Sequence, residues 1–191
     1  MNPDYKKSIE SMTQGMAYWV AYSCETSAVK FVEAEAVGEI ANILQNKLHL
    51  AAHVKREVDY RSLAHSIKVC NRADLGIFID GECKCLFEVK LAENTNGGFK
   101  SDIKKLAKVK QRNPSIECYV ILIYRNSCGK NDPKDFVSKD GKALRKTINV
   151  EVKPGVMIPV RVRRVANAIA SSTNDKMKRV VCIEVINNGT I

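Results

Sequence analysis

A chain of 191 residues can form one domain with a substantial hydrophobic core. Its charged and apolar fractions, 27% and 45%, are typical of globular proteins, which excludes a disordered or fibrous chain. The sequence contains no run of about 18 apolar residues, the length needed to span a membrane. The N-terminal segment lacks the apolar core of a signal peptide. We therefore expect a cytoplasmic protein of one domain, residues 1–191, with a core at 27–124 and a C-terminal elaboration at 125–191.

The net charge of +10 is distributed unevenly. Residues 1–50 carry 4 lysines and arginines against 6 acidic residues, whereas residues 99–112 carry 6 basic residues and one acidic residue. Residues 134–164 carry 9 basic and 3 acidic residues. Such clustering indicates a polyanion-binding face, although charge alone does not separate DNA from RNA or from an anionic membrane surface. A merely soluble basic protein is the competing interpretation.

Two helices are predicted at the start of the chain, at residues 5–22 and 27–48. The second helix has capping candidates at Thr26 and Ser27. Its apolar residues recur at helical spacing and consist of Val29, Val32, Ala36, Val37, Ile40, Ile43, Leu44 and Leu48.

A β region follows, with one amphipathic helix at 99–112 inside it. Strands are predicted from β-branched, aromatic and alternating residues at 53–60, 73–80, 83–91, 116–124, 156–165 and 179–186. The strand at 116–124 is almost continuously apolar, so it is expected in the centre of the sheet. The order α-α-β-β-β-α-β plus a β-rich C-terminal part predicts an α/β (α+β) fold, a mixed sheet flanked by helices.

Seven cysteines occur in a chain without a secretion signal, several of them inside apolar runs. This pattern predicts reduced, buried thiols. Cys83 and Cys85 have one residue between them, and no second pair at zinc-site spacing follows, which excludes a zinc ribbon.

The sequence Asp80-Gly81 predicts a hairpin between the second and third strands. Apolar residues alternate along both strands, and we expect one shared face for Leu75, Ile77, Ile79, Cys83, Cys85, Phe87 and Val89. A two-residue turn would place the isoleucines beside the charges of Glu82 and Lys84. A three-residue turn, with Phe78 paired to Glu82 and Gly81 in the left-handed conformation, avoids this conflict, so we predict that turn.

The predicted register places Asp74, Glu88 and Lys90 on the other face, with Asp74 diagonal to Glu88. Two carboxylates this close repel each other unless a cation lies between them, and oxygen ligands of this kind suit Mg²⁺ or Mn²⁺. Lys90 can orient an attacking water or stabilise the charge that develops on a phosphate. The alternative is a solvated hairpin face with an ordinary Glu88–Lys90 pair.

The segments RADLGIFID and KCLFEVKL resemble the signature of the PD-(D/E)XK nuclease superfamily, which includes many restriction endonucleases and DNA-repair nucleases. That signature is an acidic residue at the start of one strand, then (D/E)-x-K on the next. Asp74 and Glu88-Val89-Lys90 match it, while Ala73 stands where proline is usual. The resemblance covers about residues 27–124 and implies a restriction-endonuclease-like core.

By this resemblance, Asp74 and Glu88 bind Mg²⁺ with help from the Val89 carbonyl, Lys90 assists the nucleophilic water, and Mn²⁺ is expected to substitute. Hydrolysis of DNA would yield a 5′-phosphate and a 3′-hydroxyl, and the enzyme would resemble a type II restriction endonuclease. A homodimer is implied because duplex DNA has two strands to cut.

The family often adds a glutamate from the first core helix. Glu33 lies near the middle of the predicted apolar stripe, where a carboxylate is costly unless it is paired or near a metal. It is therefore the first choice, and Glu39, just outside the stripe, is the second.

Basic side chains that could contact phosphates follow or precede the catalytic strands. They are Arg72, the helix residues Lys100, Lys104, Lys105, Lys108 and Arg112, and the strand residues Arg161, Arg163 and Arg164. A solvated helical face is the alternative for the lysines, and structural pairing is the alternative for Arg72. No phosphate-binding G-x-x-x-x-G-K-[ST] loop occurs, so no nucleotide cofactor is predicted.

Other functions compatible with the pattern are a structure-selective repair, recombination or phage nuclease, and a ribonuclease. A nucleic-acid-binding module that kept the fold and lost catalysis is the alternative outside the enzymes.

Overall fold

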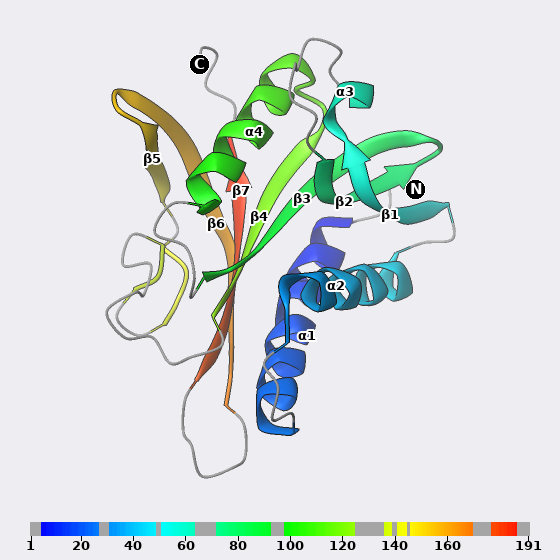
Figure 1. Cartoon of the computed structure of the whole chain (residues 1–191), viewed down its shortest axis with the longest axis vertical. Coiled ribbons are helices and arrows are strands. Elements are labelled where there is room, and N and C mark those ends of the chain that lie inside the picture. Colours follow the sequence, from blue (N-terminus) through cyan, green and yellow to red (C-terminus); the bar gives the residue numbers. More distant parts are fainter. Residues whose placement is uncertain are drawn as a thin grey trace.

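The computed structural model describes residues 5–26, 31–48, 51–63, 72–92, 98–124, 136–138, 141–144, 146–169 and 177–186. The described chain forms a seven-stranded mixed sheet in the order β1-β2-β3-β4-β7-β6-β5 (Figure 1). The strands are β1 (Ala52–Asp59), β2 (Arg72–Ile79), β3 (Glu82–Leu91), β4 (Glu117–Tyr124), β5 (Thr147–Lys153), β6 (Val156–Ala168) and β7 (Lys178–Val185). Strands β3 and β4 run parallel, and all other neighbours in the sheet are antiparallel.

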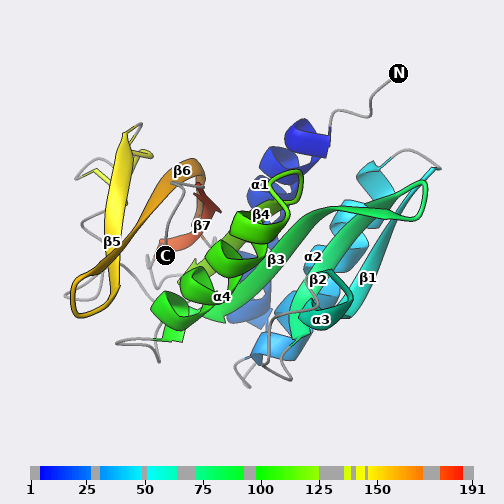
Figure 2. The ribbon, with the colours of Figure 1, turned by 90° about the horizontal axis from the view of Figure 1, so that it is seen from above.

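The helices are α1 (Tyr5–Thr26), α2 (Glu33–Lys47), α3 (Tyr60–Leu63) and α4 (Gly98–Arg112). Helices α1 and α2 cover one face of the sheet, and α4 covers the other (Figure 2). In β4, side chains alternate between the two buried cores, with Ile121 toward α1 and α2 and Val120 toward α4. The predicted mixed sheet with flanking helices, and the central place of this strand, are confirmed.

Helix α2 begins at Glu33, six residues later than predicted. Phe31 precedes the helix and packs its ring edge-to-face against Trp19 of α1, with 4.8 Å between ring centroids. The backbone N–H of Val32 then donates to the Glu35 carboxylate at 2.8 Å, which stabilises the helix start. The capping prediction is wrong for Thr26, which belongs to α1; Ser27 and Val29 lie outside the described residues.

The β2–β3 hairpin closes with a two-residue turn, so the predicted three-residue turn is wrong. Ile79 pairs with Glu82, and Asp80 and Gly81 both have positive φ, 52° and 79°, as a type I′ turn requires. The register shifts further along, where Phe78 pairs with Cys83 but Ile77 pairs with Cys85. The extra residue is therefore absorbed inside β3, at Lys84, as a β-bulge.

The bulge gives almost the predicted distribution of side chains between the two faces. The residues that pack toward α1 and α2 are Leu75, Ile77, Ile79, Cys85, Phe87 and Val89. Cys83 lies before the bulge and packs on the α4 side, so its predicted place is wrong.

Thiols are free at Cys24, Cys83, Cys85, Cys118 and Cys182, whereas Cys70 and Cys128 lie outside the described residues. No helix in the described part of the chain has the length and apolarity needed to cross a membrane.

Candidate active site

Strands β2 and β3 bring Asp74 and Glu88 together near the open end of the hairpin. Leu75 pairs with Phe87, so one further step along the ladder places Asp74 opposite Glu88. The prediction had Asp74 diagonal to Glu88. The two-residue turn and the bulge each shift the register by one residue, and together they account for the difference. The Asp74 carboxylate accepts a 2.7 Å hydrogen bond from the Val89 backbone N–H. This bond fixes the Asp74 side chain against β3.

Lys90 and Glu33 complete the set of predicted catalytic residues at this place. The Lys90 ammonium donates to Glu33 Oε1 at 2.8 Å, and Glu33 is the first residue of α2. The Lys90 side chain is 20% exposed and the Glu33 side chain 39%. Three elements, α2, β2 and β3, thus supply one cluster of charged groups. Within the described part of the chain, Glu39 makes no hydrogen bond or ion pair with this cluster.

Two further residues belong to the cluster and were not predicted. The Tyr60 hydroxyl, at the start of α3, donates to Glu88 Oε1. Asp102 of α4 is 2% exposed and accepts a 2.6 Å hydrogen bond from Lys105, whose ammonium also lies 4.0 Å from Glu88 Oε1. Asp102 Oδ2 lies 3.7 Å from the Lys90 ammonium.

A signal for Asp102 was present in the sequence. It lies three residues after Phe99 and four before Leu106, so it belongs to the apolar stripe of α4. A single acid in such a stripe is costly unless it is paired, which is the argument that selected Glu33. Nothing in the neighbours of Tyr60 distinguishes it from an ordinary core tyrosine.

The buried carboxylates hold their protons more tightly than usual. Burial is the largest cause that raises the pKa of Glu88 to about 8, and the charges of Asp102 and Asp74 add to it. The Tyr60 hydrogen bond and Lys105 act in the opposite direction. Burial also raises the pKa of Asp74, against the Val89 hydrogen bond and the Lys90 charge.

The Lys90 ammonium stays protonated in these surroundings. Burial disfavours its charge, but the hydrogen bond to Glu33 and the charge of Asp102 outweigh burial and raise the pKa of Lys90. Lys90 is therefore suited to act as a cation.

The residues of the cluster fit a divalent cation in number and charge. Among the described residues, no group of three or more His, Cys, Asp and Glu side chains is arranged to hold a metal ion. Mg²⁺, however, commonly uses one or two carboxylates and takes its other ligands from water and substrate phosphate. The cluster has four carboxylates, Glu33, Asp74, Glu88 and Asp102, against two ammonium groups, Lys90 and Lys105. When all are ionised, two negative charges remain uncompensated, which a divalent cation would balance.

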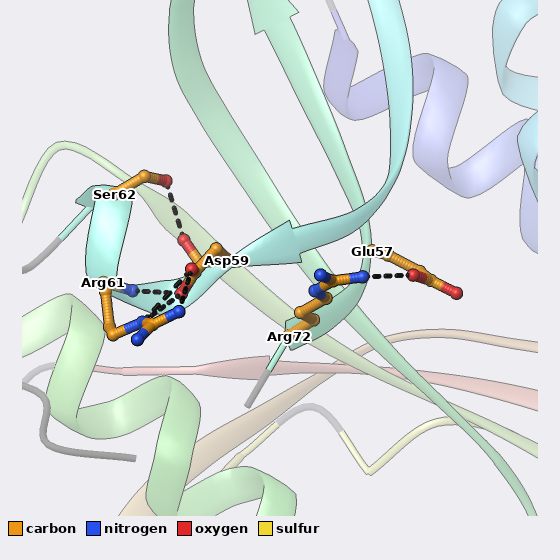
Figure 3. Close-up of polar contacts among 5 residues, drawn as sticks. All are labelled: Glu57, Asp59, Arg61, Ser62 and Arg72. Atoms are coloured by element: carbon orange, nitrogen blue, oxygen red, sulfur yellow. Dashed lines mark hydrogen bonds and ion pairs between the residues drawn. The ribbon is translucent and has the colours of Figure 1, made fainter. Parts of the chain in front are cut away.

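The predicted phosphate contacts lie in different surroundings. Arg72 is paired with Glu57 at 2.7 Å, and the exposed Arg61 is held nearby by Asp59 at 2.9 Å (Figure 3). The lysines at positions 100, 104 and 108 are half-exposed along α4, whereas Lys105 points into the carboxylate cluster.

On β6, Arg161 and Arg164 are exposed, and Arg163 pairs with Glu184 at 2.9 Å. None of these arginines contacts the carboxylate cluster within the described part of the structure.

No protein-family model matches this chain, and comparisons with characterised proteins and with solved structures give no match either. The PD-(D/E)XK resemblance thus rests on the motif residues and their arrangement, and it stays a prediction.

Proposed function

We propose that this chain is a Mg²⁺-dependent endodeoxyribonuclease of the PD-(D/E)XK type, most like a type II restriction endonuclease. One observation carries the proposal: three separate elements bring Glu33 and Lys90 to the carboxylate pair formed by Asp74 and Glu88. A solvated hairpin face would leave Glu88 in water, whereas Glu88 is 3% exposed. Buried acids with a raised pKa, next to a lysine fixed by a hydrogen bond, are typical of catalytic sites.

The residues of the cluster have distinct roles in this proposal. Asp74 and Glu88 would hold Mg²⁺, which when bound neutralises both carboxylates, polarises the scissile phosphate and lowers the pKa of the attacking water. The Val89 N–H and the Tyr60 hydroxyl fix one oxygen of each carboxylate. The Lys90 ammonium would donate hydrogen bonds to the phosphate oxygens, where negative charge develops during attack. The bond from phosphorus to the 3′ oxygen breaks, leaving a 5′-phosphate and a 3′-hydroxyl.

The test is cleavage of plasmid and genomic DNA with Mg²⁺ or Mn²⁺ by wild type, Asp74→Ala and Lys90→Ala. Both variants should lose roughly 10²–10³-fold in rate, because each removes a group that stabilises the transition state. Glu82→Ala and Lys84→Ala are matched controls, since these residues lie on the same strand and pair with each other away from the cluster. The controls should cleave like wild type.

The products distinguish the enzymes that fit this site. Discrete fragments would establish sequence-specific cleavage, and unpatterned nicking would favour a structure-selective nuclease. Branched DNA and RNA substrates, tested in parallel, would identify a resolvase-like or ribonuclease activity. Undiminished cleavage by Asp74→Ala and Lys90→Ala would show that the active site lies elsewhere. A different outcome is that the folded wild type binds DNA in a salt-sensitive way and cleaves neither DNA nor RNA. That result would support a nucleic-acid-binding module without catalysis.

A further inference from the structure

Asp102 has no role in the proposed reaction, yet it lies inside the carboxylate cluster. Its side chain is almost fully buried, and Oδ1 accepts the Lys105 hydrogen bond. Oδ2 is buried without a hydrogen-bond partner among the described groups. An unpartnered buried carboxylate oxygen is destabilising. Its presence indicates a donor that reaches it in another state of the site.

The Lys90 ammonium lies 3.7 Å from Asp102 Oδ2 and could reach it. Charge-assisted N–H···O bonds have lengths of about 2.8 Å, so a shift of about 1 Å would form the bond. Lys90 is at present held by Glu33, whose side chain is more exposed than any other carboxylate of the cluster. Because Lys105 already neutralises Oδ1, Asp102 is better placed to hold a second lysine than to act as a free metal ligand.

We propose that Asp102 is a positioning residue that takes over Lys90 when Glu33 releases it, and that keeps the ammonium inside the carboxylate cluster. This inference rests on the proposed function for its catalytic consequence, because Glu33 would leave Lys90 as it turns toward Mg²⁺ or its water shell. Asp102 acts through Lys90 and touches no substrate. Its role is that of an outer residue that orients the groups which do the chemistry.

The first test uses the metal-free protein and reads the side-chain ammonium NMR signal of Lys90, assigned by its loss in Lys90→Met. An ammonium held by a carboxylate exchanges its protons with water slowly enough to be seen, whereas a solvated one does not. Glu33→Ala should keep the signal, because Asp102 accepts the ammonium. Glu33→Ala combined with Asp102→Leu should lose it. Loss in Glu33→Ala alone, or no signal in wild type, would overturn the proposal.

Two choices of variant keep this test independent of folding. Leucine at position 102 continues the apolar stripe of α4, and apolar replacement of a buried charge is often neutral or stabilising. Asp102→Asn, which keeps the shape, is the second variant. Lys105→Met is the matched control, because it removes the other ammonium and leaves the Asp102 carboxylate in place. It should keep the Lys90 signal.

The second test measures cleavage and Mg²⁺ binding. Asp102→Leu should lower kcat about 10–100-fold and leave the KM for DNA unchanged. The double variant Asp102→Leu/Lys90→Ala should cleave no more slowly than Lys90→Ala alone, because Asp102 acts through Lys90. Calorimetry should find unchanged Mg²⁺ affinity. A loss beyond about tenfold would mean that Asp102 acts on the metal or its ligands and not through Lys90, which would overturn the proposal. If wild type cleaves nothing, the proposed function fails, while the NMR signal still decides whether Asp102 holds Lys90.

Discussion

Glu88 is the buried acid whose ionisation should control the stability of the metal-free protein. Burial, with the nearby charges of Asp102 and Asp74, raises its pKa from 4.5 to about 8. A carboxyl whose pKa is higher in the folded state stabilises the fold below its unfolded pKa, and this contribution is lost as pH rises through the folded pKa. We therefore expect the free energy of unfolding, measured with urea in EDTA, to fall between about pH 5 and pH 8 relative to Glu88→Gln.

Glu82→Gln is the control for this prediction, since Glu82 is exposed on the same strand. Its unfolding curve should follow wild type at each pH. Adding Mg²⁺ should reduce the fall, because a bound cation stabilises the ionised carboxylate. Parallel pH profiles for wild type and Glu88→Gln would contradict the raised pKa.

The residues that are brought together were predictable to different degrees. Asp74, Glu88 and Lys90 follow from a strand pattern with a period of two, which fixes the face of each side chain. A helical stripe predicts Glu33, but the helix begins only at Glu33, so the predicted helical turn before this residue is wrong. Asp102 is absent from the prediction because the basic helix next to the motif is interpreted through its lysines, as a phosphate-binding surface or a solvated face.

At the scale of elements, the hairpin shows what periodicity determines and what it leaves open. In a regular two-residue hairpin, the apolar residues of the two strands would lie on opposite faces of the sheet. One extra residue between Ile77 and Phe87 brings them to the same face. Either a longer turn or a bulge supplies this residue, and both give the same faces beyond the change. The chain uses the bulge at Lys84, a half-exposed residue whose ammonium pairs with Glu82. Strand β5 is absent from the predicted strands, although Ile148, Val150 and Val152 alternate with polar residues as in a half-buried strand.

Gly76 in β2 tests the tight packing between the hairpin and β1. A Cβ at this position would lie 2.9 Å from Val58 Cγ2 and 3.0 Å from the ring of Phe78. Gly76→Ala should therefore lower the free energy of unfolding by about 1–3 kcal/mol, as overpacking does in well-packed cores. Chemical unfolding of the purified variant measures this.

Gly38→Ala is the matched control for the same substitution. A Cβ at Gly38 in α2 would meet nothing within 4 Å, so alanine should stabilise the helix by about 0.5–1 kcal/mol. The two glycines thus predict opposite signs. A loss of stability at Gly38 similar to that at Gly76 would show that local packing does not decide the effect.

At the scale of the whole molecule, the order of elements predicted the mixed sheet but not the neighbours within it. Strand β7 lies between β4 and β6 in the sheet, although it follows both of them in the described chain. The apolar run of β7, RVVCIEVI, shows that it is buried on both faces, and this is consistent with an internal place. Several internal places satisfy the same pattern, because long-range pairing depends on contacts that a single sequence does not reveal.

Under the proposed function, the uneven charge of the molecule predicts which face would bind DNA. Lys100, Lys104 and Lys108 are spaced four residues apart on α4, so they form one stripe on the side of the sheet that holds Asp102. Binding of duplex DNA in EDTA should weaken as salt rises, with a slope of log K against log salt of about −0.9 for each phosphate contacted. Replacing one of these lysines with alanine should make the slope shallower by about 0.9, without a change in sequence preference.

Lys47→Ala is the control for the salt dependence, because Lys47 is exposed at the end of α2, against the opposite face of the sheet. It should leave the slope unchanged. A shallower slope for Lys47→Ala, with the α4 variants like wild type, would place the DNA on the side of α1 and α2. Since Lys90 reaches Glu33 on α2 as well as Asp102 on α4, the cluster lies between the two layers of helices. The slope measurement therefore decides from which layer the substrate approaches.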